Sequence, residues 1–308
     1  MLASTGRKIE AVATRIQIAK SDIVGYFENE LPHVLTRTDI ARALREKRAF
    51  WRLAQNTTLT AFIRFLTEKT KLREVRFPFP THPASGFVWG EVPLLQLLHD
   101  LIYESYYSHY TAMRLHGLTE QVPKTIYITQ EKRSGSDIYS THYDDFEQVA
   151  IDSAFSKAPR ISTNQISYKN YRITLLAGAY RAAQGIMASR VNYGDQEDLN
   201  IKYTTIERTL IDIVVRPFYA GGVFEVAKAF ENAKGRISVN KMAALYENLG
   251  FGYPYHQAIG YYLERAGYKK SVVELFEAMP MNRNFYLTHN MGKSSWVAKW
   301  HLFVPDGF

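Results

Sequence analysis

One stretch, residues 35–89, restricts the possible folds of this 308-residue chain more than any other. Near its start, Thr36-Arg37-Thr38-Asp39 has the pattern of a capping box, in which the first hydroxyl accepts from a backbone N–H one turn on and the carboxylate reaches back. The negative charge also suits a helix N-terminus. Apolar residues then recur at helical spacing until the basic pair Lys47-Arg48. We therefore expect a helix of about three turns that begins at Arg37.

A second helix is expected from Thr57 or Thr58 onward. Its apolar residues fall at i, i+3, i+4 and i+7, namely Leu59, Phe62, Ile63 and Leu66. The opposite side carries small, polar and basic residues, including Arg64. The major groove of duplex DNA admits such a side, because short residues allow close approach while Arg and Thr reach base edges and phosphates. This pattern is typical of a recognition helix.

The residues after this helix favour a β-hairpin. Leu72–Phe77 partly alternates like a strand, residues 78–86 are rich in turn formers, and Phe87–Trp89 can return as the partner strand. A supporting helix is expected earlier in the chain, between Asp22 and Pro32. Helices of this kind followed by a hairpin form a winged helix-turn-helix. We therefore predict that residues 1–89 are a winged helix-turn-helix DNA-binding domain.

The positive charge of the chain is concentrated in this predicted domain. Residues 1–88 contain 15 Lys or Arg and 8 Asp or Glu, a net of +7, whereas residues 89–308 have a net of +1. Between Arg42 and Arg76 there are ten basic residues and three acidic ones. Such an excess is expected of a surface that binds a polyanion. The alternatives are a solvated basic face without a partner and a surface that docks RNA or a toxin.

Helical position and side-chain length divide the predicted DNA contacts into two groups. Long basic side chains bind phosphates and set the register of a protein on duplex DNA, whereas contacts with base edges determine sequence preference. We expect Thr58, Thr60 and Arg64 to face the bases. The predicted phosphate contacts are Lys47, Arg48, Arg52, Lys69, Lys71, Arg73 and Arg76.

Composition excludes several other classes of protein. The chain has no cysteine, which rules out disulfides and thiolate metal sites and fits a reducing cytoplasm. No apolar run approaches the roughly 18 residues of a membrane span. Residues 9–18 are too often interrupted by polar and charged side chains for a signal peptide. We expect a soluble cytoplasmic protein that has no metal, cofactor or membrane partner.

Residues 90–308 are expected to form a larger mixed α/β domain, which makes the whole chain α+β. An apolar helix over Val92–Ser105 would open this domain, and a helix from Ser108 would end at Gly117. The further expected elements are strands at 125–129, 161–167, 171–176, 285–287 and 296–303, a polar loop at 192–200, and helices from Thr204 and at 223–233, 239–249, 255–266 and 271–279.

An acidic segment offers an alternative function of a different class. Asp144, Asp145 and Asp152 have the chemistry to hold Mg²⁺ in a metal-dependent nuclease or nucleotide-modifying enzyme. Adjacent residues point in different directions, however, and no following Glu-x-Lys pattern supports a nuclease site. A solvated acidic loop is the simpler interpretation, so we expect no enzymatic activity.

Histidines and tyrosines near the start of the predicted second domain also have two interpretations. His109 and His116 lie about two helical turns apart, which is too far for one metal ion, so we expect them to pack or to hydrogen-bond. The tyrosines between Tyr103 and Tyr110 can stack on nucleotides. Packing in the core with their hydroxyl groups at its edge is the commoner outcome for such residues.

Three separated motifs in this chain form a recognisable set: Val34–Phe77; the run Ser108–Ala112, His116–Thr119 and Pro123–Ile128; and Ile206–Asp212 with Arg216-Pro217 and Gly221-Gly222. They resemble the motifs of the AbiEi family, the antitoxin and transcriptional repressor component of type IV toxin-antitoxin systems, first associated with abortive infection by phage. The first motif resembles the winged helix of the family. The motifs occur in the expected order, and the resemblance covers most of the chain.

The resemblance implies a bacterial cytoplasmic repressor that is not an enzyme. Such a protein binds inverted repeats in its own promoter through the winged helix and counteracts a nucleotidyltransferase-like toxin through its C-terminal domain, whether or not the two proteins touch. The last motif also has a purely structural interpretation. Arg208, Asp212 and Arg216 are spaced at i,i+4, which predicts a salt-linked helix.

Overall fold

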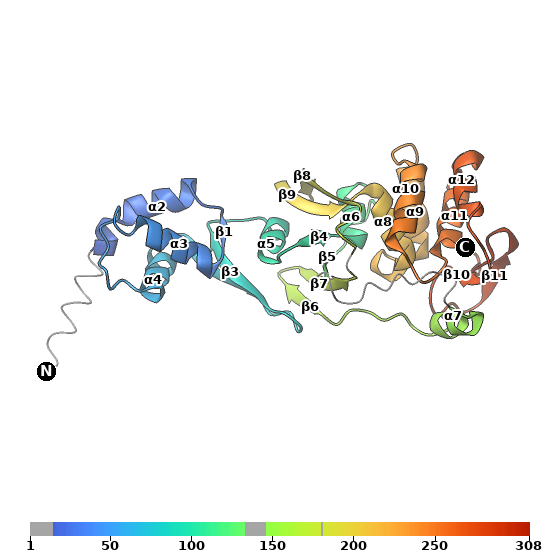
Figure 1. The fold of residues 1–308 in the computed structure, drawn as a ribbon, viewed down its shortest axis with the longest axis horizontal. Coiled ribbons are helices and arrows are strands. Elements are labelled where there is room, and N and C mark those ends of the chain that lie inside the picture. The colour runs from blue at the N-terminus through green and yellow to red at the C-terminus, as the bar shows by residue number, and fades with distance from the viewer. Residues whose placement is uncertain (1–14, 133–145, 180) are drawn as a thin grey trace. The chain divides into compact units, whose positions relative to one another are not determined.

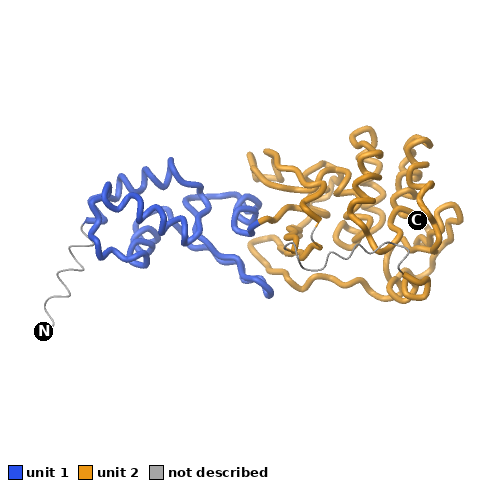
Figure 2. The backbone as a smooth tube through the Cα atoms, viewed as in Figure 1, with its two compact units in different colours: residues 1–103 blue, residues 104–308 orange. Residues whose placement is uncertain are grey.

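The computed structural model describes residues 15–132, 146–179 and 181–308, and it has a mixed α+β fold. The chain divides into two compact units, residues 1–103 (unit 1) and 104–308 (unit 2), which are coloured separately in Figure 2. Within the described residues the strands form three sheets, of three, three and six strands. Each unit has its own hydrophobic core.

Unit 1 combines helices with a small antiparallel sheet whose strand order is β1-β3-β2 (Figure 1). In chain order its elements are α2 (Lys20–Asn29), β1 (Val34–Leu35), α3 (Arg37–Lys47), α4 (Leu59–Lys69), β2 (Leu72–Phe77), β3 (Ala84–Trp89) and α5 (Leu94–Leu101).

The two predicted helix starts in unit 1 are confirmed. The Thr36 hydroxyl accepts from the backbone N–H of Asp39 at 3.2 Å, and the Asp39 carboxylate accepts from the backbone N–H of Thr36 at 2.9 Å, which completes the capping box of α3. The Thr58 hydroxyl accepts from the backbone N–H of Ala61 at 3.2 Å, so α4 begins directly after it. Local sequence therefore determines where both helices begin.

The predicted hairpin is also present. Strand β2 has the predicted bounds, while β3 begins at Ala84, three residues before the predicted start. In their antiparallel register Val75 lies opposite Gly86. The other edge of β3 pairs with β1, where Val34 lies opposite Val88. Sequence reasoning missed β1 because a strand of two residues is too short to show an alternating pattern.

Stacked aromatic side chains hold the helices of unit 1 in place. Phe27 of α2 stacks on Trp89 of β3, with ring centroids 5.1 Å apart. Trp51, in the segment between α3 and α4, stacks on Phe62 of α4 at 5.7 Å. All four side chains are buried. The outward orientation of α4 is therefore fixed by packing on its inner side.

Helix α5 belongs to unit 1, whereas the apolar pattern over residues 92–105 suggested that it opens the second domain. It packs against β1 and β3. Gly86 of β3 makes the close approach possible, since a Cβ atom there would lie 2.5 Å from Leu101 Cδ2 and 2.9 Å from the carbonyl oxygen of Leu35. The boundary between the units therefore follows this helix.

This close approach gives a testable prediction. We expect Gly86→Ala to destabilise unit 1 by about 1–3 kcal/mol, because the added methyl group overpacks the contact with α5. The control is Gly25→Ala in α2, where a Cβ atom meets nothing within 4 Å and alanine favours the helix by about 0.5–1 kcal/mol. Urea unfolding followed by circular dichroism measures both. Equal stabilities of the two variants would contradict the packing of α5 on β3.

Unit 2 is built on a six-stranded mixed sheet with the order β6-β7-β5-β4-β9-β8. Strands β5 and β7 are parallel, as are β4 and β9, and the remaining neighbours are antiparallel. The strands are β4 (Ser105–Tyr107), β5 (Thr125–Glu131), β6 (Gln165–Tyr168), β7 (Tyr171–Gly178), β8 (Ile186–Tyr193) and β9 (Gln196–Thr204).

Helices and a second small sheet complete unit 2 (Figure 1). Helix α8 follows β9 directly and contacts α6, α9, α10 and α11. The helices are α6 (His109–Leu115), α7 (Gln148–Phe155), α8 (Ile206–Val215), α9 (Val223–Ala233), α10 (Val239–Leu249), α11 (Tyr255–Arg265) and α12 (Lys270–Glu277), and the small sheet has β10 (Phe285–Tyr286), β11 (Ser294–Val297) and β12 (Leu302–Pro305).

Two predictions for unit 2 are wrong. The expected polar loop at 192–200 is instead part of the β8–β9 hairpin, which turns at Gly194 with a φ of 61°. Its second strand buries Leu199, Ile201 and Tyr203 in alternation, and the many polar residues between them hid this pattern. The single strand expected at 296–303 is two antiparallel strands, β11 and β12, joined by a 3₁₀ turn.

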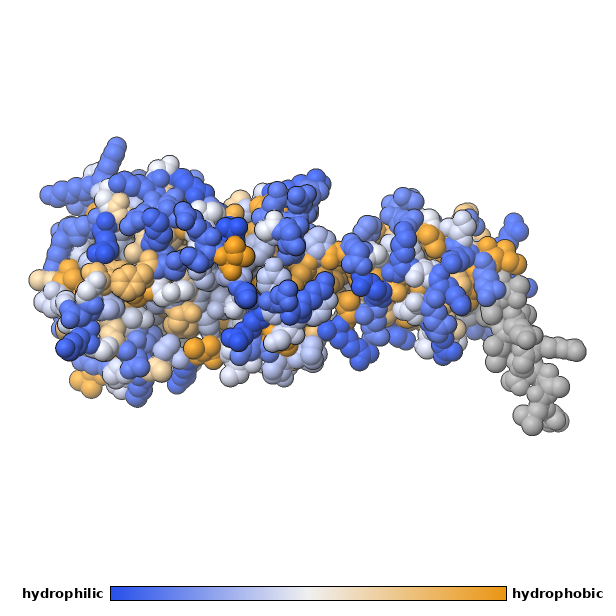
Figure 3. Space-filling model, turned by 180° about the vertical axis from the view of Figure 1, so that it is seen from behind, coloured by the Kyte–Doolittle hydropathy of each residue, from blue (hydrophilic) through white to orange (hydrophobic). Residues whose placement is uncertain are grey.

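Hydrophilic side chains cover most of the face shown in Figure 3, and apolar residues occupy smaller patches on it. Among the described residues, the helices are too short and too polar to cross a lipid bilayer. The exposed large apolar side chains include Phe50 in unit 1 and Phe224 in unit 2. They are single residues of the kind that folded proteins commonly expose.

Candidate functional site

The outward side of α4 is the first candidate site. Its inner residues Phe62 and Leu66 are fully buried, whereas Thr60, Arg64 and Thr67 are exposed. These three lie at i, i+4 and i+7, so they occupy one side of the helix. The side is narrow and polar, because two of the three side chains are threonines. The longer side chain of Arg64, between the two threonines, can extend its guanidinium beyond them.

The three residues predicted to face bases differ in their local contacts. Thr58 caps the helix with its hydroxyl, so that group is already used. The hydroxyl of Thr60 accepts from the guanidinium of Arg37 at 3.4 Å. Arg64 makes no side-chain hydrogen bond or ion pair within residues 15–132, 146–179 and 181–308. Arg64 is therefore the member of this group that is best placed to contact a ligand.

The basic residues predicted to contact phosphates lie on α4 itself and on the segments before and after it in the chain. Arg52 and Lys69 are exposed, and their charged groups form no ion pair with any described residue. Three other predicted phosphate contacts form ion pairs, namely Lys71 with Glu28 at 2.6 Å, Arg73 with Glu91 at 2.9 Å and Arg76 with Glu74 at 2.7 Å. All three pairs are solvent-exposed, and such pairs contribute little to stability. They can therefore exchange a carboxylate for a phosphate at small cost.

The positive charge of this surface affects nearby carboxylates and rings. The hydrogen bond from Lys71 and its electrostatic attraction lower the pKa of Glu28 from its ordinary value. Lys47 lies over the ring of Tyr26, 4.9 Å from its centroid. Cation–π contacts of this kind hold a lysine in place without neutralising its charge. The surface thus keeps a positive character around α4.

Arg48 has a structural position that sequence reasoning did not foresee. Its guanidinium donates to the carbonyl oxygens of Ala54 at 2.7 Å, Thr57 at 2.9 Å and Gln55 at 3.3 Å. These bonds hold the segment between α3 and α4.

Arg37 is a site residue that the sequence did not predict, although it reaches Thr60. The spacing of two helices in sequence does not reveal how they pack.

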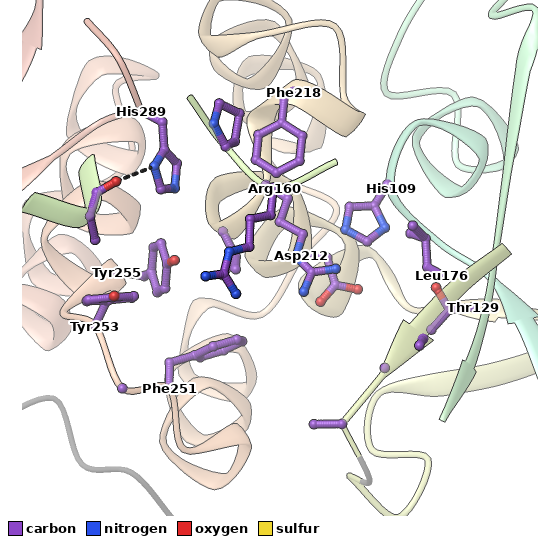
Figure 4. A pocket seen from close by; sticks show the side chains of 18 of the residues that line it. His109, Thr129, Arg160, Leu176, Asp212, Phe218, Phe251, Tyr253, Tyr255 and His289 are labelled. Atoms are coloured by element: carbon purple, nitrogen blue, oxygen red, sulfur yellow. Dashed lines mark hydrogen bonds between the residues drawn. The ribbon is translucent and has the colours of Figure 1, made fainter. Parts of the chain in front are cut away.

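Unit 2 contains a second candidate site, a pocket of about 840 Å³ (Figure 4). This volume lies within the range of pockets that bind small molecules. Its walls come from the strands β4, β5 and β7, the helices α7 and α8, and the loops that follow them. The charged lining residues are Lys157, Arg160, Arg181, Arg208, Arg216 and Asp212, and the large aromatic ones are Tyr106, Phe218, Phe251, Tyr253 and Tyr255.

A buried ion pair forms the floor of the pocket. Arg208 Nε donates to Asp212 Oδ1 at 2.8 Å, and Arg208 Nη1 donates to the carbonyl oxygen of Gln184 at 2.6 Å. Both charged side chains are about nine-tenths buried. The predicted pair is therefore confirmed, but it lies in the interior of unit 2. The other predicted pair, Asp212 with Arg216, does not form among the described residues.

The charges of the pair stabilise each other. Burial lowers the pKa of Arg208, yet the pKa lies above its ordinary value because Asp212, Tyr106 and Glu131 together outweigh burial. Burial raises the pKa of Asp212 against the attraction of Arg208. A separation of 2.8 Å is that of a charge-assisted hydrogen bond, so we treat both groups as ionised at neutral pH.

His109 faces the same pocket from the start of α6 (Figure 4). It is buried, and its Nδ1 hydrogen-bonds the Ser108 hydroxyl at 2.8 Å. Burial, together with the charges of Arg216 and Arg208, holds the pKa of His109 well below its ordinary value. The other histidine of the motif, His116, donates from Nε2 to the carbonyl oxygen of Thr204 at 2.6 Å. Each histidine is thus hydrogen-bonded, but the two do not bind each other.

The acidic segment is only partly described. Asp144 and Asp145 lie outside the described residues. Asp152 accepts from the side-chain amide of Gln148 at 2.7 Å and from the Tyr286 hydroxyl at 2.9 Å. Across residues 15–132, 146–179 and 181–308, no group of three or more His, Asp or Glu side chains could hold a metal ion. Asp152 therefore connects α7 to β10.

The tyrosine cluster divides between core and surface. Tyr106 and Tyr107 are buried, whereas Tyr103 is 68% exposed. Tyr110 donates to the carboxylate of Glu225 at 3.2 Å. Core packing is thus the role of the two tyrosines in β4. One of them, Tyr106, also lines the pocket and donates to Glu131 at 3.2 Å.

Comparison with known proteins identifies a similar fold. No family description matches this chain, and no curated protein matches it in sequence. Its structure is similar to the crystal structure of the RV2827C protein from Mycobacterium tuberculosis. The two share 17% sequence identity, the alignment covers 93% of this chain and 91% of the other, and the TM-score is 0.55. At this level of identity the likeness concerns the fold of the whole chain.

Proposed function

We propose that this protein is a DNA-binding autorepressor and antitoxin, in which unit 1 is a winged helix-turn-helix and α4 is its recognition helix. The observation that carries the proposal is the exposed guanidinium of Arg64, which has no partner among the described residues and lies at the centre of a narrow polar helix side. A recognition helix needs such a side, because it must enter the major groove and present donors to base edges.

The surroundings of α4 support this proposal. Strands β2 and β3 form a hairpin next to α4 in the chain, at the place that a wing occupies after a recognition helix. Arg52 and Lys69 offer free charges, and the exposed pairs of Lys71, Arg73 and Arg76 can open toward phosphates. Contacts of this kind supply most of the affinity for DNA, while a few base contacts supply the preference for sequence.

The resemblance to the AbiEi family supplies the second half of the proposal. It suggests that the target is a set of inverted repeats in the promoter of the protein's own operon, and that unit 2 counteracts a nucleotidyltransferase-like toxin encoded beside it. Motifs in both units carry this resemblance. The bacterial cytoplasm is the location that such a function requires.

The role of Arg64 can be tested by substitution. We expect Arg64→Ala to lose about 1–3 kcal/mol of binding to the upstream DNA, because a bidentate contact with a base is removed. Arg64→Lys keeps the charge but cannot form this contact, so it should lose sequence preference as well. Fluorescence anisotropy with the upstream DNA and with a random duplex measures both effects.

Arg45→Ala provides the matched control for Arg64. Arg45 is an exposed arginine of α3 outside the predicted contacts, and its side chain is 76% exposed. We expect its replacement to leave the preference for the upstream DNA unchanged. Equal losses of Arg64→Ala on the upstream DNA and on the random duplex would contradict a base-reading role for this residue.

A further inference from the structure

The pocket of unit 2 takes no part in the DNA contacts proposed for unit 1. Five of its lining side chains are cationic, namely Lys157, Arg160, Arg181, Arg208 and Arg216. Asp212 is the carboxylate among the described lining residues, and it is held by Arg208. Neutral imidazoles of two histidines complete the polar lining, since burial lowers the pKa of both His109 and His289. The pocket therefore carries an excess of positive charge.

Two of these arginines have guanidinium groups without a hydrogen-bond or ion-pair partner in the part of the chain that the structure describes. The side chains of Arg160 and Arg216 form no hydrogen bond or ion pair with any residue in the described part of the chain. Arg160 points into the pocket in Figure 4. Burial lowers the pKa of His109, and the charge of Arg216 adds to this effect. Burial raises the pKa values of Tyr255 and Asp212, and the charge of Arg216 opposes both shifts. A guanidinium presents up to five N–H donors in a fork that matches phosphate oxygens.

The nearby acidic residues do not cancel this charge. Glu131 lies behind Tyr106, and its carboxylate accepts from the Tyr106 hydroxyl and from the backbone N–H groups of Arg181 and Ala183. Asp212 is engaged by Arg208. Both carboxylates are thus satisfied within the protein. The free donors of Arg160 and Arg216 remain available for an anion.

Aromatic rings line the same pocket. Phe251 and Tyr255 meet edge to face with centroids 5.6 Å apart, and Tyr253 lies edge to face with Tyr255 at 6.1 Å. Figure 4 shows these rings around one side of the pocket, with His109 and Thr129 across from them. Arg181 lies over the ring of Phe251 at 5.9 Å. Phe251 also stacks on Tyr246 at 5.6 Å and Tyr253 on Phe146 at 5.0 Å, so each of these two rings has one face against the protein, and a planar heterocycle would stack on the other.

We propose that this pocket binds a nucleotide, with its phosphates held by Arg160 and Arg216 and its base stacked among Phe251, Tyr253 and Tyr255. The pocket volume of about 840 Å³ suits a ligand of this size. The pocket has both cationic groups and aromatic rings, the two kinds of partner that a nucleotide requires. A ligand with phosphates alone would leave the aromatic rings without a partner, and a ligand with a ring alone would leave the arginines without one.

Isothermal titration calorimetry on the full-length protein tests this proposal. The ligands are ATP, GTP and AMP, with adenosine as the ring without phosphate and tripolyphosphate as the phosphate without a ring. We expect at least one nucleotide to bind about tenfold or more tightly than both partial ligands. Binding of tripolyphosphate as tight as that of the nucleotides, or of adenosine as tight, would overturn the proposal, as would the absence of binding by every nucleotide at millimolar concentration.

Variants separate the two halves of the pocket. Arg160→Gln and Arg216→Gln are each expected to weaken nucleotide binding about tenfold or more, because each removes charge-assisted hydrogen bonds. Phe251→Leu is expected to weaken nucleotide binding by a similar factor while leaving tripolyphosphate binding unchanged. The control is Arg190→Gln on β8, whose side chain is 77% exposed outside the pocket and should leave binding unchanged.

Thermal unfolding of each variant shows whether it is folded. If Phe251→Leu is unfolded, Tyr253→Leu is used in its place. Equal nucleotide affinity of the wild-type protein and of both arginine variants would overturn the proposal. Tighter binding of a short single-stranded RNA than of every nucleotide, lost in the same variants, would assign the pocket to RNA and also overturn it. Loss of DNA binding by Arg64→Ala, with nucleotide binding unchanged, would show that nucleotide binding does not depend on the proposed DNA-binding function.

Discussion

Asp212→Ala is expected to destabilise unit 2 by about 3–5 kcal/mol, because it leaves the charge of Arg208 buried without its partner. The guanidinium retains only the carbonyl oxygen of Gln184 as a hydrogen-bond acceptor. Arg208 is 7% exposed, so its own contact with solvent is small. Urea unfolding at neutral pH, followed by far-UV circular dichroism, measures the loss.

Two controls isolate the effect of burial in this experiment. Glu274→Ala removes the carboxylate of an exposed pair on α12, in which Lys270 lies 3.8 Å away, and is expected to have little effect. The double variant Arg208→Met with Asp212→Leu removes both charges and should recover a large part of the stability lost by Asp212→Ala. A loss for Asp212→Ala no greater than that for Glu274→Ala would contradict a buried, ionised pair.

A fragment of residues 1–103 is expected to separate DNA binding from antitoxin activity completely. Unit 1 has its own core, and α5 belongs to it, so the fragment should end after α5 rather than at Trp89. We expect the fragment to bind the upstream DNA with the same sequence preference as the full chain. If a neighbouring gene encodes the proposed toxin, the fragment should give no protection to cells that express it, because unit 2 is missing.

Growth of toxin-expressing cells and a gel-shift assay on the fragment test both halves of this prediction. The full-length protein carrying Arg64→Ala is the converse variant, since it should protect cells while its DNA preference is reduced. Protection by residues 1–103 alone would give unit 2 another role. Failure of the folded fragment to bind any DNA would place the DNA-binding surface outside unit 1.

Local patterns predicted much of the fold. The capping box at Thr36, the hairpin strand Leu72–Phe77 and the bounds of α9 and α10 all follow from signals within a few residues of one another. The structure departs from prediction where contacts are distant in sequence. Strand β1 exists only because β3 pairs with it, and α5 belongs to unit 1 only because Gly86 admits Leu101.

In the candidate sites, too, local sequence predicted some residues, while the roles of others depend on contacts that are distant in sequence. Arg64 could be assigned to the outer side of a helix from apolar spacing alone, whereas the bonds of Arg48 to three carbonyl oxygens depend on the path of the following loop. The pocket of unit 2 was not predicted. The spacing of Arg208 and Asp212 revealed their pairing, but Arg160 and Arg181 lie in irregular segments whose sequence does not reveal which helix they meet.

The salt dependence of binding to the protein's own upstream DNA tests the central claim most directly. If unit 1 binds duplex DNA through about six to ten phosphate contacts, the affinity should fall by a factor of about 10³ to 10⁵ between 50 and 200 mM salt. A competing RNA duplex should displace the upstream DNA poorly. No binding of the upstream DNA at low salt, or binding whose affinity does not change as salt is added, would contradict the account.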